Sequence, residues 1–151
     1  MPQSLARVWI HLIFSTKNRD PFLTDKQLRL ETHVCLATVL RNHDCETLIV
    51  GGVEDHVHAL FALSRNHSIA DIVKEIKIAS SKSIKEKSPA LKKFSWQSGY
   101  GAFSVSQSHL DQVTRYIERQ EEHHKRVTFQ DEFRAFLKKY NIEYDERYVW
   151  D

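Results

Sequence analysis

The 151-residue chain has little cysteine, proline and glycine: two cysteines, three prolines and four glycines. Cys35 and Cys45 lie ten residues apart, without the close pairing of a metal knuckle, so we expect reduced thiols in a cytoplasmic protein. No apolar run approaches the length that spans a bilayer, and no G-x-x-x-x-G-K-[ST] loop is present. We therefore expect one domain, residues 1–151, with no membrane and no nucleotide cofactor as partners.

A strong excess of charge of one sign is also missing, because 22 basic residues face 20 acidic ones and the formal net charge is +2. Any basic surface must therefore be local. Two segments offer one: a polar loop after the first expected strand and one side of the second expected helix. Their candidate contacts to DNA phosphates are Lys17, Arg19, Lys74, Lys77, Lys82 and Lys85. Solvated side chains on the same surfaces remain the alternative.

The hydrophobic pattern of the chain predicts four strands and four helices. The strands are expected at 8–15, 46–50, 57–63 and 94–105, and the helices at 24–42, 68–87, 108–124 and from 128 or 131 to 140. A glycine pair, Gly51-Gly52, favours a hairpin between the second and third strands. The order β-α-β-β-α-β predicts an α+β fold of the ferredoxin-like split βαβ type, with a four- to five-stranded antiparallel sheet.

The fourth predicted strand contains two glycines, where we expect a bend or bulge. It also carries Trp96, Tyr100 and Phe103. These aromatic rings either stack on unpaired bases or belong to the core.

Two histidines, His56 and His58, stand two residues apart at the start of the third strand. Side chains alternate along a strand, so both imidazoles face the same side, roughly 7 Å apart. That spacing lets two neutral imidazoles bind one divalent ion, although a pair of ordinary strand histidines has the same pattern. Because a metal site needs access, we expect them on the face of the sheet that the first two helices leave open.

The third predicted helix places Tyr116 one turn before Gln120. Gln120 continues the inward stripe of Val113 and Ile117, and a buried amide needs a polar partner. A metal ion beside the two histidines would supply one, and a backbone group is the alternative. His123, seven residues after Tyr116, either assists proton transfer or is a surface histidine.

Three segments together resemble a known family. His56-Val57-His58 is similar to the histidine-hydrophobe-histidine signature of HUH endonucleases. With the segments 96–105 and 113–124 it resembles the single-tyrosine transposases of the smallest bacterial insertion sequences, the two-hundred and six-hundred-five type. The resemblance covers nearly the whole chain.

This resemblance implies that His56, His58 and Gln120 hold a divalent cation, Mg²⁺ or Mn²⁺, and that Tyr116 is the nucleophile. It implies a homodimer with possible trans active sites, and we expect the two copies to pair through the sheet, at an open edge left by the first strand. The expected activity is cutting and rejoining single-stranded DNA at hairpin-bearing element ends through a covalent 5′-phosphotyrosine. A non-catalytic nucleic-acid-binding regulator derived from such a transposase is the alternative.

Overall fold

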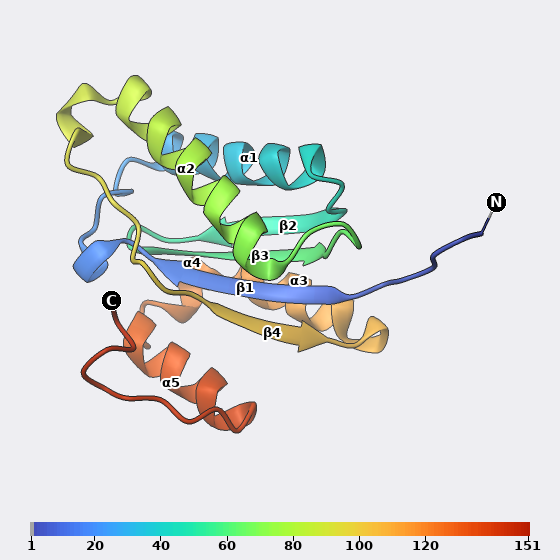
Figure 1. Cartoon of the computed structure of the whole chain (residues 1–151). Helices are drawn as coiled ribbons and strands as arrows, with labels where there is room; N and C mark the ends of the chain where they lie inside the picture. Colours follow the sequence, from blue (N-terminus) through green and yellow to red (C-terminus); the bar gives the residue numbers. More distant parts are fainter. Residues whose placement is uncertain (1) are drawn as a thin grey trace.

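A computed structural model describes residues 2–151 as a sheet with helices on both faces (Figure 1). The strands are β1 (Trp9–Ser15), β2 (Thr47–Gly52), β3 (His56–Ala62) and β4 (Gly101–Val105). The helices are α1 (Lys26–Asn42), α2 (Ile69–Lys87), α3 (Leu110–Glu118), α4 (Gln120–His123) and α5 (Phe129–Lys139). Short 3₁₀ turns occupy Lys17–Arg19, Pro89–Leu91 and Gln107–His109.

The sheet is antiparallel throughout and has the strand order β2-β3-β1-β4. This order and the chain order β-α-β-β-α-β confirm the split βαβ fold. β2 and β3 form the predicted hairpin, but Gly51 and Gly52 are the last residues of β2, paired with β3, and the turn lies at 53–55. Gly52 has φ +151°, and a Cβ there would overlap the His56 carbonyl oxygen, so only glycine fits at the end of β2.

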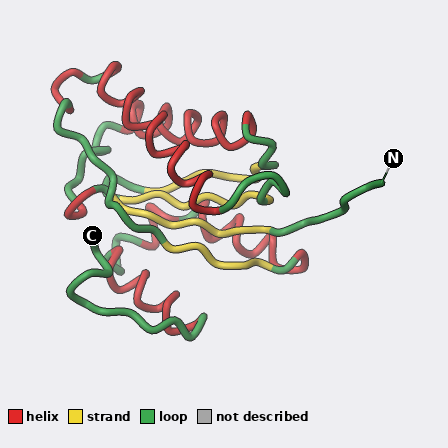
Figure 2. Tube along the Cα trace, viewed as in Figure 1, coloured by secondary structure: helices red, strands yellow, loops and turns green. Residues whose placement is uncertain are grey.

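Helices α1 and α2 cover one face of the sheet, as Figure 2 shows in its upper layer. Beneath them lies the larger core cluster, to which β3 contributes Val57, Ala59 and Phe61. Ser68 caps α2 by accepting a hydrogen bond from the Asp71 amide. α1 is capped by Asp25, one residue later than the predicted start, because its carboxylate accepts from two backbone amides.

Helices α3, α4 and α5 cover the opposite face, to which the alternation of β3 directs His56, His58 and Leu60 (Figure 1). This placement confirms that the two histidines face away from α1 and α2. The third predicted helix crosses the face from the same chain. α5 adds an aromatic cluster in which Phe133 packs near Phe103 of β4.

Two sequence boundaries differ from the structure. The fourth strand begins only at Gly101, and 94–100 makes a single bridge, Trp96 to Thr16, because the segment crosses the end of the sheet. The predicted helix 108–124 divides into a 3₁₀ turn, α3 and α4, since Arg119 (φ −97°, ψ 19°) leaves the helical conformation. Ser108 therefore caps no helix.

β1 lies in the centre of the sheet, between β3 and β4. The expectation that the first strand leaves an open edge is therefore wrong, because β1 is paired on both sides and the edge strands are β2 and β4. The sheet-paired dimer stays a prediction that these two strands would have to satisfy. Within residues 2–151, no helix combines the length with the apolar character that crossing a membrane requires.

Candidate active site

Four structural elements bring their polar side chains together on the α3–α5 face. β3 supplies His56 and His58, both with no exposed surface. α3 supplies the half-buried Tyr116, α4 supplies Gln120 (1% exposed) and α5 supplies Glu132 (3% exposed). The structure thus gathers the four residues that the sequence singled out, and adds a carboxylate.

Close contacts join these groups directly. The Gln120 Oε1 atom lies 3.2 Å from His56 Nε2. Glu132 Oε1 lies 3.0 Å from His58 Nε2 and 3.4 Å from His56 Nε2. The other carboxylate oxygen, Oε2, accepts hydrogen bonds from the Tyr116 hydroxyl and, at 3.2 Å, from the Gln120 amide. The Glu132 carboxylate therefore bridges the Tyr116 phenol and both imidazoles.

The far side of each imidazole also has a partner. His56 Nδ1 lies 2.6 Å from the Asp55 carboxylate, and His58 Nδ1 lies 2.8 Å from His11 Nε2. Hydrogen bonds at Nδ1 are the usual support of a metal-binding histidine, because they orient the ring and leave Nε2 for the ion. Both Nε2 atoms point into the cluster.

Burial and charge act on these groups in opposite ways. Burial lowers the pKa of His56, but the carboxylates of Asp55 and Glu132 outweigh it and raise the pKa to about 9. Burial lowers the pKa of His58 to about 4 against the pull of Glu132. Burial, together with the Glu132 carboxylate, raises the pKa of Tyr116 well above that of a free phenol. Tyr116 is thus protonated at neutral pH.

Two neighbouring histidines extend the cluster. His123 Nε2 lies 3.3 Å from both the Tyr116 hydroxyl and Glu132 Oε2. His124 Nε2 lies 3.2 Å from Glu132 Oε2. Ligand atoms of His56, His58, His124 and Glu132 all lie within 4.8 Å of one another. Imidazole nitrogens and a carboxylate oxygen at this spacing are a donor set that suits a divalent cation.

The chain is similar to proteins of a known family. The model of the family described as "Transposase IS200 like" matches residues 4–120. The chain belongs to the IS200-like transposase family. The match ends at Gln120, so it includes both β3 histidines and Tyr116 but stops before α4 is complete and leaves out α5.

Two solved structures resemble this transposase. One, a Deinococcus radiodurans R1 protein classed as a transposase, has 27% identity and a TM-score of 0.61, with 80% of this chain and 95% of that one covered. The other, a REP-associated tyrosine transposase bound to a REP hairpin, has 17% identity and a TM-score of 0.59, with 84% and 74% covered. The second likeness supports the fold alone. A search of curated proteins found no match.

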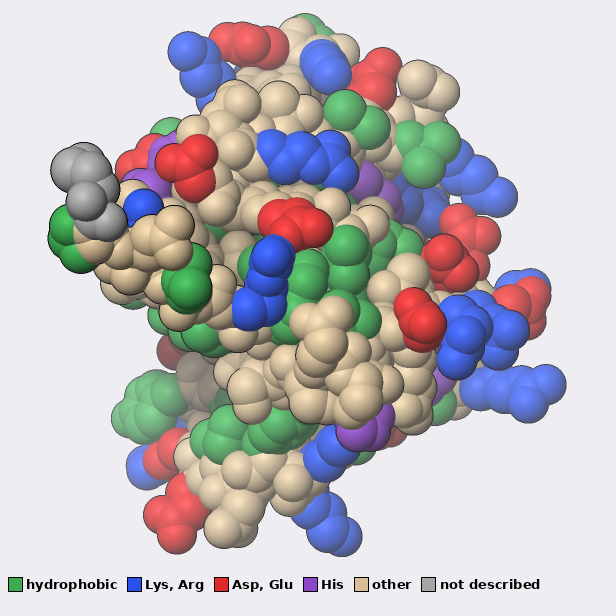
Figure 3. Space-filling view, turned by 90° about the vertical axis from the view of Figure 1, so that its right-hand side faces the viewer, with side chains coloured by type: hydrophobic (Ala, Val, Ile, Leu, Met, Phe, Trp, Pro, Cys, Tyr) green, Lys and Arg blue, Asp and Glu red, His purple; other side chains and the backbone are tan. Residues whose placement is uncertain are grey.

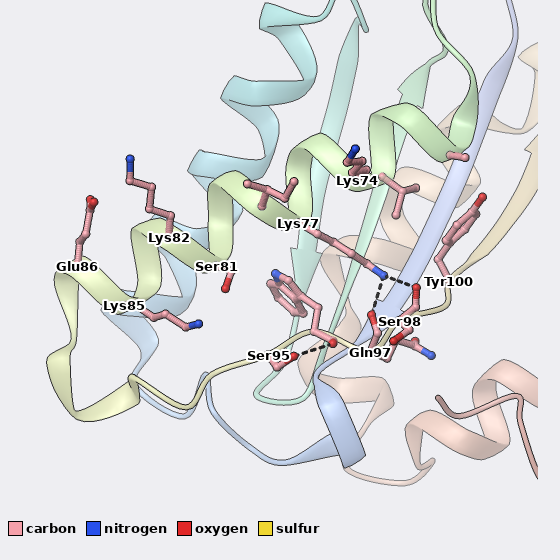
Figure 4. Close-up of a pocket in the computed structure, with 14 residues that line it drawn as sticks. Lys74, Lys77, Ser81, Lys82, Lys85, Glu86, Ser95, Gln97, Ser98 and Tyr100 are labelled. Carbon is pink, nitrogen blue, oxygen red and sulfur yellow. Dashed lines mark hydrogen bonds between the residues drawn. The ribbon is translucent and has the colours of Figure 1, made fainter.

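The predicted DNA-binding lysines of the transposase differ in their surroundings. Lys77 is partly buried, and its ammonium group donates to the carbonyls of Gln97 (2.8 Å), Ser98 (3.3 Å) and Gly99 (2.7 Å). Burial lowers its pKa to about 8. Figure 4 shows its side chain directed at this segment. Lys77 therefore holds the approach to β4 in place.

A groove of about 830 Å³ runs between α2 and the 95–100 segment. Lys74, Lys82 and Lys85 border it and are exposed. Figure 4 shows Lys85 directed toward the segment and Lys82 away from it. Tyr100 (38% exposed) and Trp96 (6%) both line the groove, and Trp96, like Phe103 (2%), belongs to the core.

The other predicted contacts, Lys17 and Arg19, occupy the 3₁₀ turn after β1. Lys17 is exposed, while the Arg19 guanidinium lies 5.8 Å from the centre of the Trp150 ring. Elsewhere basic and acidic side chains alternate, as on the face in Figure 3. Exposed basic side chains are thus present at both predicted segments, without a continuous basic face in that view.

Sequence reasoning missed Glu132, Asp55, His11 and His124. Glu132 carried a usable signal: it lies three residues after Phe129 and directly before Phe133, so a carboxylate continues an apolar helical stripe. His11 had none, because its contact with His58 depends on how β1 and β3 pair.

Proposed function

We propose that this transposase cuts and rejoins single-stranded DNA at hairpin-bearing element ends, through a covalent intermediate on Tyr116. The observation that carries the proposal is the convergence of a phenol, two imidazoles and a carboxamide in one buried cluster. Membership of the transposase family supports the reaction class.

In the proposed step, the Tyr116 oxygen attacks the scissile phosphorus and a new O–P bond forms. The bond from phosphorus to the 3′ oxygen breaks, the phenol loses its proton, and the leaving 3′ oxygen gains one. The products are a 5′-phosphotyrosine and a free 3′ hydroxyl, which reverses the step on another strand. Because one phosphodiester replaces another, no ATP is needed.

His56, His58 and Gln120 would hold the cation, for which we propose Mg²⁺ or Mn²⁺. When bound, such an ion neutralises phosphate charge and orients the phosphorus for attack. An amide oxygen beside two imidazoles suits a partly hydrated, exchangeable ion that accepts phosphate oxygens. His123, 3.3 Å from the phenol, is placed to take part in proton transfer.

The substrate needs a route to Tyr116. A groove of about 810 Å³, between α3 and α5, is lined by Tyr116 and also by Gln112, Lys139 and Tyr140. We propose that an unpaired strand reaches Tyr116 through this groove. We propose that the hairpin itself lies along exposed Lys74, Lys82 and Lys85, with Lys17 and Arg19 as further phosphate contacts.

The homodimer belongs to the same proposal. In this structure the tyrosine helix serves the histidines of its own chain, so trans active sites would require α3–α5 to exchange between subunits. Analytical ultracentrifugation that gives only monomer at micromolar concentration would remove the dimer from the proposal.

The test is covalent labelling. Purified protein with Mg²⁺ or Mn²⁺ and a single-stranded hairpin oligonucleotide, labelled on the 3′ side of the cleavage site, should give a labelled protein band that survives denaturation. Tyr116→Phe should give none, while Tyr148→Phe, at a 63% exposed position outside both grooves, should label like the parent. Equal labelling of Tyr116→Phe and the parent would contradict the assignment of the nucleophile. A folded parent that binds the hairpin but never reacts would favour the non-catalytic regulator.

A further inference from the structure

The Glu132 carboxylate is a charged group with almost no exposed surface, and the proposed reaction as stated gives it no role. It comes from α5, beyond the 4–120 region that the family model matches. Burying an ionised carboxylate is costly unless charges or hydrogen bonds compensate it. The position of this buried carboxylate in the middle of the cluster therefore needs a physical explanation.

The two carboxylate oxygens face different groups. Oε1 faces the imidazoles, 3.0 Å from His58 Nε2 and 3.4 Å from His56 Nε2. Ligands held about 2.1 Å from one ion stand about 3.0 to 3.4 Å apart, by the geometry of six- and four-coordinate sites. The distances from Oε1 fall in that range, as does the 3.2 Å between His56 Nε2 and Gln120 Oε1.

The supporting contacts agree. Asp55 and His11 engage the Nδ1 atoms of His56 and His58, so both Nε2 atoms are turned toward Oε1. This is the second layer of hydrogen bonds that metal-binding histidines require.

We infer that Glu132 is a fourth cation ligand, supplied by α5, and that its Oε2 atom positions the Tyr116 hydroxyl. One oxygen would bind the ion and the other accepts the hydrogen bond from the phenol. A hard cation takes six or more ligands, so four protein donors still leave places for phosphate oxygens. The inference rests on the proposed function, because it concerns the same ion.

A cation bound to Glu132 would also affect how α5 docks on the sheet. The helix is attached to the sheet by Phe129, Phe133 and Leu137, and Glu132 lies among these residues on the buried side. If the ion binds Glu132, it binds better when α5 is docked, and by linkage it stabilises docked α5. Cation binding would then order the helix that borders the groove beside Tyr116.

The test measures cation binding rather than catalysis. Isothermal titration with Mn²⁺ alone, on the full chain, should show at least tenfold weaker binding for Glu132→Gln than for the parent. Asp131→Asn, which removes an exposed carboxylate one residue away on the same helix, is the matched control and should bind like the parent. Circular dichroism establishes that each variant is folded. Glu132→Asp, with a shortened carboxylate, should also weaken Mn²⁺ binding and serves if Glu132→Gln does not fold.

Hydrogen exchange gives a second readout. Mn²⁺ should slow amide exchange within 129–139 of the parent and of Asp131→Asn, but not of Glu132→Gln. Tight Mn²⁺ binding by Glu132→Gln, with the same protection of α5, would overturn the ligand role while leaving the proposed function intact. Absence of Mn²⁺ and Mg²⁺ binding to the parent would overturn the metal site of the proposed function itself.

Discussion

Lys77 stabilises the fold through its hydrogen bonds, in contrast to the exposed lysines of α2 for which we propose contacts to DNA. Its ammonium group donates to three consecutive carbonyls, at 2.8 Å (Gln97), 3.3 Å (Ser98) and 2.7 Å (Gly99). Replacing it with methionine keeps most of the aliphatic stem and removes all three donors, together with the Nζ atom that lies 5.0 Å from the centre of the Phe14 ring. The 97–99 segment then loses the three hydrogen bonds that join it to the Lys77 side chain of α2.

The expected cost follows from the bonds lost. Hydrogen bonds from charged donors contribute about 1.5 to 3 kcal/mol each, and the two shorter ones here are partly buried. The released carbonyls partly recover by binding water, since Ser98 is exposed. We expect Lys77→Met to lower the free energy of unfolding by about 2 to 4 kcal/mol. In a domain of this size that corresponds to a melting temperature lower by about 5 to 12 °C.

The assay is urea denaturation followed by circular dichroism, with Lys85→Met as the matched control. Lys85 lies two helical turns along α2, lines the same groove and makes no such contact. We expect its variant to keep parental stability and to bind hairpin DNA more weakly, with a smaller salt dependence. Parental stability of Lys77→Met, or an equal loss for both variants, would refute the reasoning.

Three further predictions concern other parts of the molecule. Gly51→Ala places a Cβ 2.9 Å from Ile117 Cγ2 and 3.1 Å from the Ile117 carbonyl oxygen. It should therefore shift α3 and lower the free energy of unfolding by about 1 to 3 kcal/mol. Covalent labelling through Tyr116 should slow more than that of a surface variant of equal stability. Asp55→Asn should weaken Mn²⁺ binding about 10- to 100-fold in titration calorimetry, because His56 loses its supporting carboxylate; unchanged affinity would count against the role of Asp55. Burial, with a smaller effect of Arg29, lowers the pKa of His33 to about 4, below the 6.5 of the unfolded chain. Because the unfolded chain then binds more protons, the free energy of unfolding should fall by about 2 to 3 kcal/mol from pH 6.5 to 4. His33→Gln should make that slope shallower in urea denaturation, and an unchanged slope would show that other groups determine it.

The first three strands and the shared face of the two β3 histidines could be predicted because local patterns determine them. The alternation in β3 directs His56 and His58 to one face whatever the rest of the chain does. The four-residue spacing of Tyr116 and Gln120 likewise brings both to Glu132, even though the helix is interrupted at Arg119.

The remaining parts depend on long-range packing. Aromatic residues at 94–100 favour a strand, but Trp96 donates to the Ser80 hydroxyl of α2 and the segment leaves the sheet. The neighbours of His58 come from β1 and α5, 47 and 74 residues away, and no local pattern fixes their distance. The same holds for Lys77, whose carbonyl partners lie about twenty residues further along the chain.

The central claim is that Tyr116 attacks the DNA backbone. Trypsin should release this residue in the short peptide Tyr116-Ile117-Glu118-Arg119, since Arg115 precedes it. After reaction with a hairpin oligonucleotide and Mn²⁺, followed by nuclease digestion, mass spectrometry should find a 5′-linked nucleotide on that peptide. A nucleotide attached to any other residue would contradict the account.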